Sequence, residues 1–507
     1  MTRPACAPLL LVAALSLLSG CASLYLHRAP PSPRAPWPLP AERTRASRAS
    51  PDSPPIVSDH VYSLPELIDL AESINPDTRI GWQRARQAAL GVGVAMAGYF
   101  PLVSALTLIG YQHTWFPVPN LRGSILGVNP FQILPSVSFM LPQLPQPSGD
   151  IGVDTWQVLP FLFVRWEIFN LGRGAEVRAA KHLSEAANAL FTAEHERVIF
   201  EVARAFFRLN AARAQVAVSR DALERTREIA KAAEARYAQG IATVVETTEA
   251  RREVAQADYS VAQAQSLEIA AHAALVSAIG IDPEARLETA GNVSAALPGR
   301  LQRTVEAYVE EALTARADLR AARIRLPATE QRVSRSLAAY APRVTLTGTG
   351  GAAVLGAHVD GVNLPTLTLP NFTAGVNFEW LLFDGGLREV QAELARSQNA
   401  EAAQELVKIQ HQVVQEVVTA YNEVNASLSR YQAATALFDT AATAEAAITK
   451  SYLNGLATFT DTMSAQKARA LASAAKEQSF ADALVATTTL AFTAGELLSA
   501  RAVPQAP

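Results

Sequence analysis

Few residue patterns in this chain of 507 residues could do chemistry, and the first of them is a cysteine near the start. Arg3 precedes an apolar run from Leu9 to Leu18, and small residues follow, which is the pattern of an export signal. Residues 18–21, LSGC, match the bacterial lipobox, so cleavage would leave Cys21 as the first residue with a lipid on its thiol. An ordinary secretory signal with a chance cysteine is the alternative. The other cysteine, Cys6, lies inside the signal, so we expect no disulfide.

Patterns typical of catalysis are missing from the rest of the sequence. It contains no G-x-S-x-G, no Walker loop and no H-E-x-x-H, and its eight histidines form no i, i+4 pair. Residues 348–353, GTGGAA, fit the loosest dinucleotide fingerprint, but they fall within a predicted strand and open no helix. We therefore expect no enzyme, no metal site and no cofactor apart from the lipid on Cys21.

Charge and hydropathy exclude further classes of protein. The formal net charge of -3 with 18% charged residues implies no bulk attraction to nucleic acid. Beyond the N-terminus, no segment has the roughly 20 predominantly apolar residues that a spanning helix needs. Residues 27–55 are rich in proline and arginine and predict an extended tether. Its arginines could lie against anionic headgroups, or the tether could simply be solvated.

From Val61 onward the sequence repeats itself. A shift of 241 positions, from Pro101 to Pro342, aligns the first half of each copy, and a shift of 214, from Trp166 to Trp380, aligns the residues that follow the second strand. One further residue of offset, from Tyr237 to Tyr452, aligns the helix turns. Each copy reads as helix, strand, strand, helix. We divide the chain into a signal peptide (1–20), a lipidated N-terminus with tether (21–60), a first repeat (61–285), a linker (286–300), a second repeat (301–500) and a tail (501–507).

The helices of each copy are long and carry heptad seams. The seams run from Val198 to Tyr237 and from Val413 to Tyr452, with large residues tending to one seam position and small ones to the other; Glu445 alone interrupts the second seam. Such a pattern suits a wall of helices packed side by side, and a helix from about residue 172 to 239 would be roughly 100 Å long. Glycines at 240 and 455 are expected to end these helices as left-handed caps and start return helices. Isolated coiled-coil hairpins would explain the seams but not the strands.

Four strands are predicted, at about 102–113, 153–169, 343–354 and 371–384. From Phe372 to Leu382 apolar side chains alternate with polar ones, which is typical of a strand with lipid on one face and water on the other. Pro160 raises a question about the continuity of the second strand. Trp166 and Trp380 fall where strands would leave the bilayer, while core tryptophans of a soluble sandwich are the alternative reading.

Four strands are too few to close a membrane barrel, and open strand edges cannot lie in hydrocarbon. We therefore expect a barrel shared between subunits: three chains would supply twelve strands, and their helices would form a second, α-helical barrel. Pro101 and Pro342 would mark the points where helix gives way to strand.

The sequence resembles the TolC-type outer membrane efflux proteins, and its lipoprotein start resembles members that serve resistance-nodulation-division pumps. The resemblance covers residues 61 to 499 and rests on NPDTR, YFPLVS, FNLGRG and RYAQGIATVVET in the first copy and on AYAPRVTLTGTG, EWLLFDGG and SYLNGLATFTDT in the second. It implies a homotrimer in the outer membrane of a Gram-negative bacterium, with a helical duct in the periplasm that docks on an adaptor and an inner membrane pump. Ala22 after the cysteine resembles lipoproteins sorted to the outer membrane.

The resemblance also implies roles for the helix turns, which form the periplasmic tip that meets the adaptor. Glu246 and Asp461 follow the two turn glycines by six residues, and three copies of Asp461, with Glu246, could form an acidic ring that selects cations and holds the tip closed. Mutual repulsion would raise the pKa of such carboxylates. Alternatively, these acids serve only the helix dipole. Ser464 stands where some relatives carry a second acidic residue. The residues of the two turns are Tyr237, Gly240 and Thr243, and Tyr452, Gly455 and Thr458.

Two questions stay open at the level of sequence. The apolar segment at about 114–152 could fold over the channel mouth or pack against its neighbours. The cargo is also undetermined: efflux of drugs or other small molecules is the first hypothesis, with type I protein secretion, metal-ion efflux and a non-conducting structural lipoprotein as alternatives. Only four methionines and scattered histidines indicate no copper or silver path.

Overall fold

The computed structural model describes residues 30, 32–34, 60–116, 151–282, 287–290, 297–359 and 362–497. The chain divides into two units, which we describe separately: one comprises Met1–Gly93, Arg178–Gln331 and Ala395–Pro507, and the other Val94–Val177 and Arg332–Leu394. Cys21, most of the tether, the tail and nearly all of the segment at about 114–152 lie outside the described residues.

The element order is the same in both halves of the chain. The first half contains α3 (Leu64–Ile74), α4 (Pro76–Ala97), β2 (Leu102–Phe116), β3 (Ile151–Phe169), α5 (Leu171–Ala238) and α6 (Val244–Ile279). The second contains α7 (Val305–Ala315), α8 (Ala317–Ala338), β5 (Arg343–Val359), β7 (Leu367–Glu379), α9 (Leu387–Leu453) and α10 (Phe459–Ala494). The long helices have 68 and 67 residues and both return helices 36, so the internal repeat extends to the lengths of the elements.

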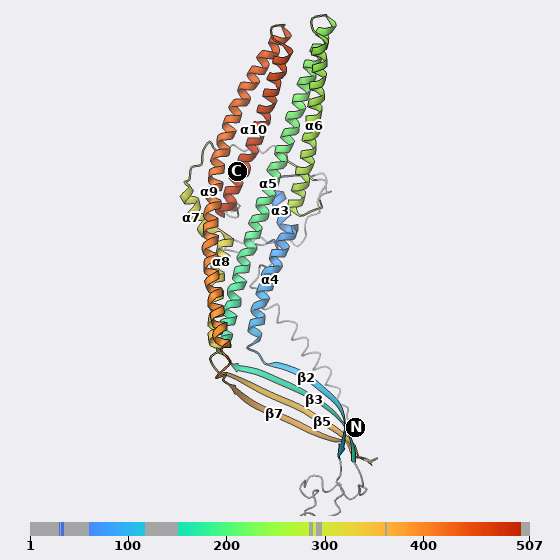
Figure 1. Cartoon of the computed structure of the whole chain (residues 1–507), viewed down its shortest axis with the longest axis vertical. Helices are drawn as coiled ribbons and strands as arrows, with labels where there is room; N and C mark the ends of the chain where they lie inside the picture. The colour runs from blue at the N-terminus through green and yellow to red at the C-terminus, as the bar shows by residue number, and fades with distance from the viewer. Residues whose placement is uncertain are drawn as a thin grey trace, which may run out of the picture. The chain divides into compact units, whose positions relative to one another are not determined.

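In the larger unit, α5 with α6 and α9 with α10 form two hairpins that run side by side (Figure 1). The predicted seams are buried along most of their length: Val202 and Leu209 in α5 and Val417 and Val424 in α9 are fully buried. Glu445 is also buried, and its carboxylate lies 4.0 Å from the Arg225 guanidinium, which explains how the second seam tolerates an acid. The heptad prediction is confirmed.

Two apolar cores lie where the short helices pack against the long ones. Leu67 of α3 packs with Leu209 of α5 and Leu275 of α6, and Tyr308 of α7 packs with Val417 of α9 and Leu490 of α10. Fully burying a side chain of this size stabilises a fold by about 1.5–3 kcal/mol, so these clusters hold the short helices against the long ones. A two-residue parallel ladder of β1 (Val61–Tyr62) and β4 (Glu288–Thr289) lies beside the first core.

The smaller unit contains an antiparallel sheet with the strand order β2-β3-β5-β7, and a short strand β6 (Val362–Asn363) pairs with the end of β5. Strands β3 and β5 join the two repeats at the centre of the sheet (Figure 1). Strand β3 is continuous through Pro160, which pairs with Thr107 of β2 but has no partner in β5. The lost ladder bond therefore interrupts one side of the strand without ending it.

Three strands have boundaries that differ from the sequence prediction. Strands β2 and β5 extend beyond residues 113 and 354, to Phe116 and Val359. The fourth strand was expected at 371–384, but β7 runs from Leu367 to Glu379. It ends at Glu379 because this residue lies opposite Arg343, where its partner β5 begins. Beyond it, the Asp384 carboxylate accepts hydrogen bonds from the backbone N–H groups of Gly386 and Arg388 at the start of α9. Among the described residues, no helix is both long and apolar enough to cross a bilayer.

Candidate functional site at the helix turns and strand junctions

The second turn, between α9 and α10, is closed by its own residues. Gly455 has a φ of 76°, the left-handed conformation predicted for it, and its N–H donates to the Tyr452 carbonyl at 2.9 Å. Thr458 caps α10: its hydroxyl accepts from the Asp461 N–H at 3.1 Å, and the Asp461 carboxylate accepts from both the N–H and the hydroxyl of Thr458. These bonds from Thr458 lower the pKa of the Asp461 carboxyl, so Asp461 acts as half of a capping box.

The first turn, between α5 and α6, uses its acid differently. Gly240 has a φ of 72°, and the Thr243 hydroxyl accepts from the Glu246 N–H at 3.3 Å, but the Glu246 carboxylate does not reach back to the cap. Instead, its Oε1 accepts a hydrogen bond of 2.6 Å from the hydroxyl of Tyr452 in α9. The equivalent acids of the two repeats therefore make different contacts. Asp461 bonds to the cap of its own helix, whereas Glu246 bonds to the opposite hairpin.

Tyr452 is the residue on which the two turns converge. It is only 1% exposed and packs with Ile229 and Ala233 of the first hairpin and with Phe459 and Met463 of its own. Burial, and then the hydrogen bond to Glu246, raise the pKa of the Tyr452 hydroxyl, so this group stays a protonated donor at physiological pH.

Arg236 completes the contact from the first hairpin. Its guanidinium lies 4.7 Å from the centre of the Tyr452 ring, and its Nη1 donates to the Tyr452 carbonyl at 2.8 Å. We call Arg236, Glu246 and Tyr452 the tip clamp. Sequence reasoning missed Arg236, although the aligned repeats carried a signal: the equivalent position in the second copy is Ser451.

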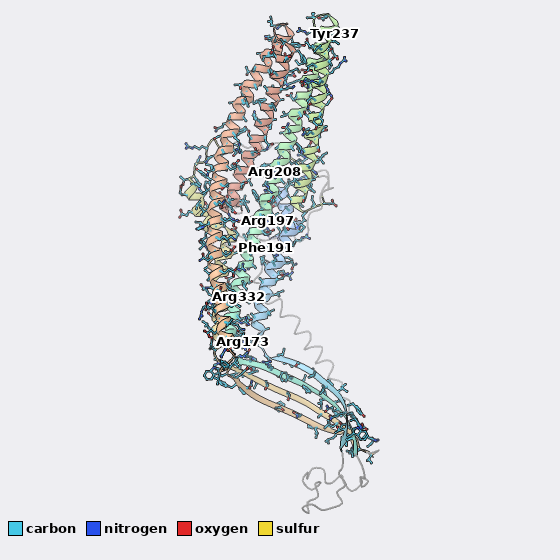
Figure 2. All side chains as sticks on the ribbon, viewed as in Figure 1. Arg173, Phe191, Arg197, Arg208, Tyr237 and Arg332 are labelled. Carbon is cyan, nitrogen blue, oxygen red and sulfur yellow. The ribbon has the colours of Figure 1, made fainter. Side chains whose placement is uncertain are left out.

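Tyr237 matches Tyr452 in sequence but not in environment. It lies at the end of the first hairpin and is 49% exposed (Figure 2). Its carbonyl accepts from the Gly240 N–H at 2.9 Å, but within the described part of the chain its side chain has no hydrogen bond, ion pair or ring contact. The six predicted turn residues thus lie at the two turns, but only Tyr452 joins one hairpin to the other.

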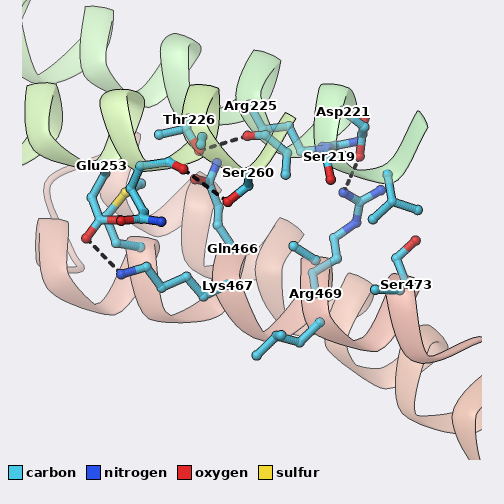
Figure 3. Close-up of a pocket in the computed structure, with 18 of the residues that line it drawn as sticks. Ser219, Asp221, Arg225, Thr226, Glu253, Ser260, Gln466, Lys467, Arg469 and Ser473 are labelled. Carbon is cyan, nitrogen blue, oxygen red and sulfur yellow. Dashed lines mark hydrogen bonds and ion pairs between the residues drawn. The ribbon is translucent and has the colours of Figure 1, made fainter. Parts of the chain in front are cut away.

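Beside the turns, ion pairs join the hairpins across a cavity of about 340 Å³ that is lined by α5, α6 and α10. Lys467 donates to Glu253 at 2.7 Å, and Arg469 donates to Asp221 at 2.8 Å (Figure 3). The hydrogen bonds from Arg469 and Arg225 lower the pKa of the Asp221 carboxyl despite the opposing effect of its burial. Side chains of opposite charge therefore hold α10 against the first hairpin.

The smaller unit contains two matching helix-to-strand junctions. The Trp166 indole donates to the Tyr99 carbonyl at 2.9 Å, and the Trp380 indole donates to the Tyr340 carbonyl at 3.1 Å. Pro101 and Pro342 follow these tyrosines and precede β2 and β5. Arg173 and Arg388 place their guanidinium groups 4.8 and 4.9 Å from the rings of Tyr99 and Tyr340. Each tryptophan predicted at a bilayer boundary therefore also fixes the chain where it changes from helix to strand.

The described residues include no group of three or more histidine, cysteine, aspartate or glutamate side chains that could hold a metal ion. Long paired hairpins, duplicated strand junctions and a sheet with apolar side chains on its surface are the features of a membrane channel component.

A family model described as outer membrane efflux protein matches residues 67–281 and 308–496, and this chain belongs to that family. The protein is thus an outer membrane efflux channel component with its helical part in the periplasm. Protein CyaE of Bordetella pertussis is 25% identical over 381 residues, which cover 73% of this chain and 71% of CyaE.

Solved structures agree on the fold. The outer membrane protein VceC of Vibrio cholerae matches with a TM-score of 0.64 and 21% identity, over 85% of this chain and 96% of VceC. The CmeC outer membrane channel of Campylobacter jejuni matches with a TM-score of 0.67 and 16% identity, over 85% of each chain. The predicted fold class, mostly helical with a membrane β-sheet, is confirmed.

Proposed function

We propose that three copies of this chain form one passive duct through the outer membrane. The observation that carries the proposal is the open sheet: β2 and β7 lie at its two edges, each paired along one side only among the described strands. Open backbone edges are too costly in hydrocarbon, so β2 of one copy must pair with β7 of the next. Three copies supply twelve strands, which is within the range of membrane barrels.

Apolar side chains on the surface of the helices support assembly. Tyr259 and Ile269 of α6, Val390 of α9 and Leu471 of α10 are 64%, 71%, 67% and 72% exposed in the single chain. Single exposed apolar residues are common, but here they recur along the lengths of several helices. Neighbouring copies would cover them and close the helices into a periplasmic tube.

A lipid on Cys21 would add a second attachment to the membrane. The described part of the tether already contacts the folded chain: the Trp82 indole of α4 donates to the Pro30 carbonyl at 2.9 Å, and Arg86 lies over the Trp82 ring at 4.7 Å. Nine peptide steps separate Cys21 from Pro30 and span at most about 30 Å when extended. The lipid would therefore be held within that reach of α4.

The duct would receive drugs or other small molecules from a periplasmic adaptor and an inner membrane pump, with the two helix turns as the docking end. In this proposal the tip clamp keeps the hairpins together at rest, and the exposed Asp461 carboxylates of three copies form the acidic constriction. Glu246 contributes through Tyr452 rather than through a second ring. Type I protein secretion and metal-ion efflux are the alternative cargoes, and no contact in the described chain favours either.

Dye release from proteoliposomes tests the duct. Vesicles containing the purified, lipidated protein and a small trapped dye should lose the dye, while a large dextran trapped with it is retained. Native mass spectrometry of the same preparation should give the mass of three chains. Retention of the small dye by vesicles with inserted protein would contradict the duct and favour a structural lipoprotein.

A further inference from the structure

A polar row crosses the sheet at the strand ends opposite the helix-to-strand junctions. The strand registers place His113 of β2 opposite Asp154 of β3, Asp154 opposite His358 of β5, and His358 opposite Asn363 of β6. Residues directly opposite one another in a ladder project from the same face. Four side chains with hydrogen-bonding nitrogen or oxygen atoms therefore stand side by side on one face of the sheet.

The members of this row are in contact. His113 Nδ1 lies 2.5 Å from Asp154 Oδ1, the Tyr111 hydroxyl donates to the same carboxylate oxygen, and His358 Nδ1 lies 2.8 Å from Asn363 Oδ1. The Trp115 ring meets the His113 ring edge-on at 4.6 Å. The His113 and Asp154 side chains remain 35% and 31% exposed, so the row is accessible from outside the sheet.

The row lies on the apolar face of β3. Counting back from Asp154 by pairs leads through Trp156, Val158, Leu162 and Val164 to Trp166, all on that face. Trp156 and Trp166 are ten residues apart, about 33 Å along the strand and about 25 Å across a bilayer at the usual tilt, which is the height of the apolar band of such barrels. The row falls one residue pair beyond Trp156, at the level of the headgroups of the outer leaflet.

We propose that His113 and His358 form a pH-dependent binding surface for the phosphate groups of outer-leaflet lipids. This inference rests on the proposed function, because it requires the strands to span the outer membrane. Histidine changes charge between about pH 5 and pH 8. With both histidines neutral the row carries only the Asp154 carboxylate, a charge of -1; with both protonated it carries -1 + 2 = +1.

The other groups that face His113 and His358 do not oppose this change in the net charge of the row. The Tyr111 hydroxyl donates to Asp154, Asn363 carries no charge, and Asp154 is the only acid among the described residues of the row. Asp154 holds one imidazolium by an ion pair and leaves one positive charge for an external anion. Protonation of both histidines would therefore convert a surface that repels phosphate into one that binds it.

Lipid titration of the purified channel, followed by native mass spectrometry at about pH 5.5 and about pH 7.5, tests the proposal. The probe is bis-phosphorylated lipid A. We expect its apparent dissociation constant to be lower at the acidic pH, by up to about fivefold for each protonated histidine. Dephosphorylated lipid A should show no such difference, and an equal affinity of the two lipids would overturn the proposal.

Substitutions separate the row from general surface charge. His113→Gln with His358→Gln should abolish the pH difference, and His113→Lys with His358→Lys should give tight binding at both pH values. His411→Gln, at an exposed histidine of α9, is the matched control and should leave the difference intact. A pH difference that survives the double glutamine variant would contradict the proposal. Dye release by the same preparations shows separately whether the duct itself exists.

Discussion

The two helix turns began as the same sequence and now differ. Tyr452 is 1% exposed and bonded to the opposite hairpin, whereas Tyr237 is 49% exposed. Asp461 caps its own helix, whereas Glu246 bonds across the hairpins. By contrast, the two strand junctions of the same repeats kept matching contacts. The two repeats therefore have matching contacts at the strand junctions and different contacts at the helix turns.

Residue identity explains why only one clamp forms. The first repeat supplies Arg236, which covers the Tyr452 ring, but the second has Ser451 at that position and offers nothing equivalent to Tyr237. Phe459 and Met463 pack with Tyr452, and their counterparts in the first repeat are the smaller Val244 and Thr248. A few side chains, rather than the backbone, create the asymmetry.

Truncating the two tyrosines should give the largest difference. Tyr452→Ala removes a buried ring and should destabilise the clamp by about 3 kcal/mol, while Tyr237→Ala should stay within about 0.5 kcal/mol of the parent. Hydrogen exchange of the amides around Ile229 and Ala233 measures the effect, which should reach about 100-fold for Tyr452→Ala. Equal protection in the two variants would contradict the asymmetry.

Removing only the hydroxyl should have an intermediate effect. Tyr452→Phe loses the bond to the Glu246 carboxylate and should cost about 1–2 kcal/mol of local stability. Combined with Glu246→Ala, it forms a double-mutant cycle that should give a coupling energy of about 1 kcal/mol. Tyr237→Phe with Glu246→Ala is the control cycle and should be additive. Coupling in the control cycle would show that the effect is not specific to the clamp.

The stability of the tip should also depend on alkaline pH, because the Tyr452 hydroxyl can lose its proton there. Because the pKa of Tyr452 is raised in the folded chain, its contribution is complete below the ordinary tyrosine pKa near 10 and is lost as pH rises through the higher folded value. Exchange protection of the tip should therefore hold up to about pH 10 in the parent and then fall. Tyr452→Phe, which has nothing to ionise, should show no such fall, and identical profiles would contradict this assignment.

The pH dependence of cation selectivity tests whether Asp461 serves only its own helix or forms an acidic ring with its copies. We expect a smaller effect here than at Tyr452. In the single chain the Thr458 hydrogen bonds lower its pKa, so its stabilising contribution is present above the unfolded value near 3.8 and is lost as pH falls below it. We expect the cation selectivity of the channel to persist down to about pH 4. Loss of selectivity near neutral pH would indicate carboxylates that repel one another. Thr458→Ala should cost the α10 cap about 1 kcal/mol.

The strand junctions should show the smallest difference between repeats. Trp166→Phe and Trp380→Phe each remove one hydrogen bond to a tyrosine carbonyl, and each should cost about 1 kcal/mol. Thermal unfolding of each variant in the same detergent measures this. A much larger effect in one repeat would show that the junctions have diverged as the turns have.

The sequence predicted what short-range patterns determine. The heptad seams, the left-handed Gly240 and Gly455, the four strands and the family are confirmed because periodicity, glycine conformation and duplication are local signals. The predicted end of β7 was wrong because its partner β5 begins only at Arg343, opposite Glu379, and the tip clamp was missed because it joins residues more than 200 positions apart. Lipidation of Cys21, adaptor docking and the acidic ring stay predictions.

Single-channel conductance in a planar bilayer tests the central claim most directly. We would compare the lipidated parent protein with Tyr452→Phe and Tyr237→Phe. The account predicts small steps for the parent, larger steps for Tyr452→Phe because loss of the hydrogen bond to Glu246 weakens the clamp, and parental steps for Tyr237→Phe. Equal steps in all three would contradict a gate at the clamp, and silence from inserted protein would contradict the channel.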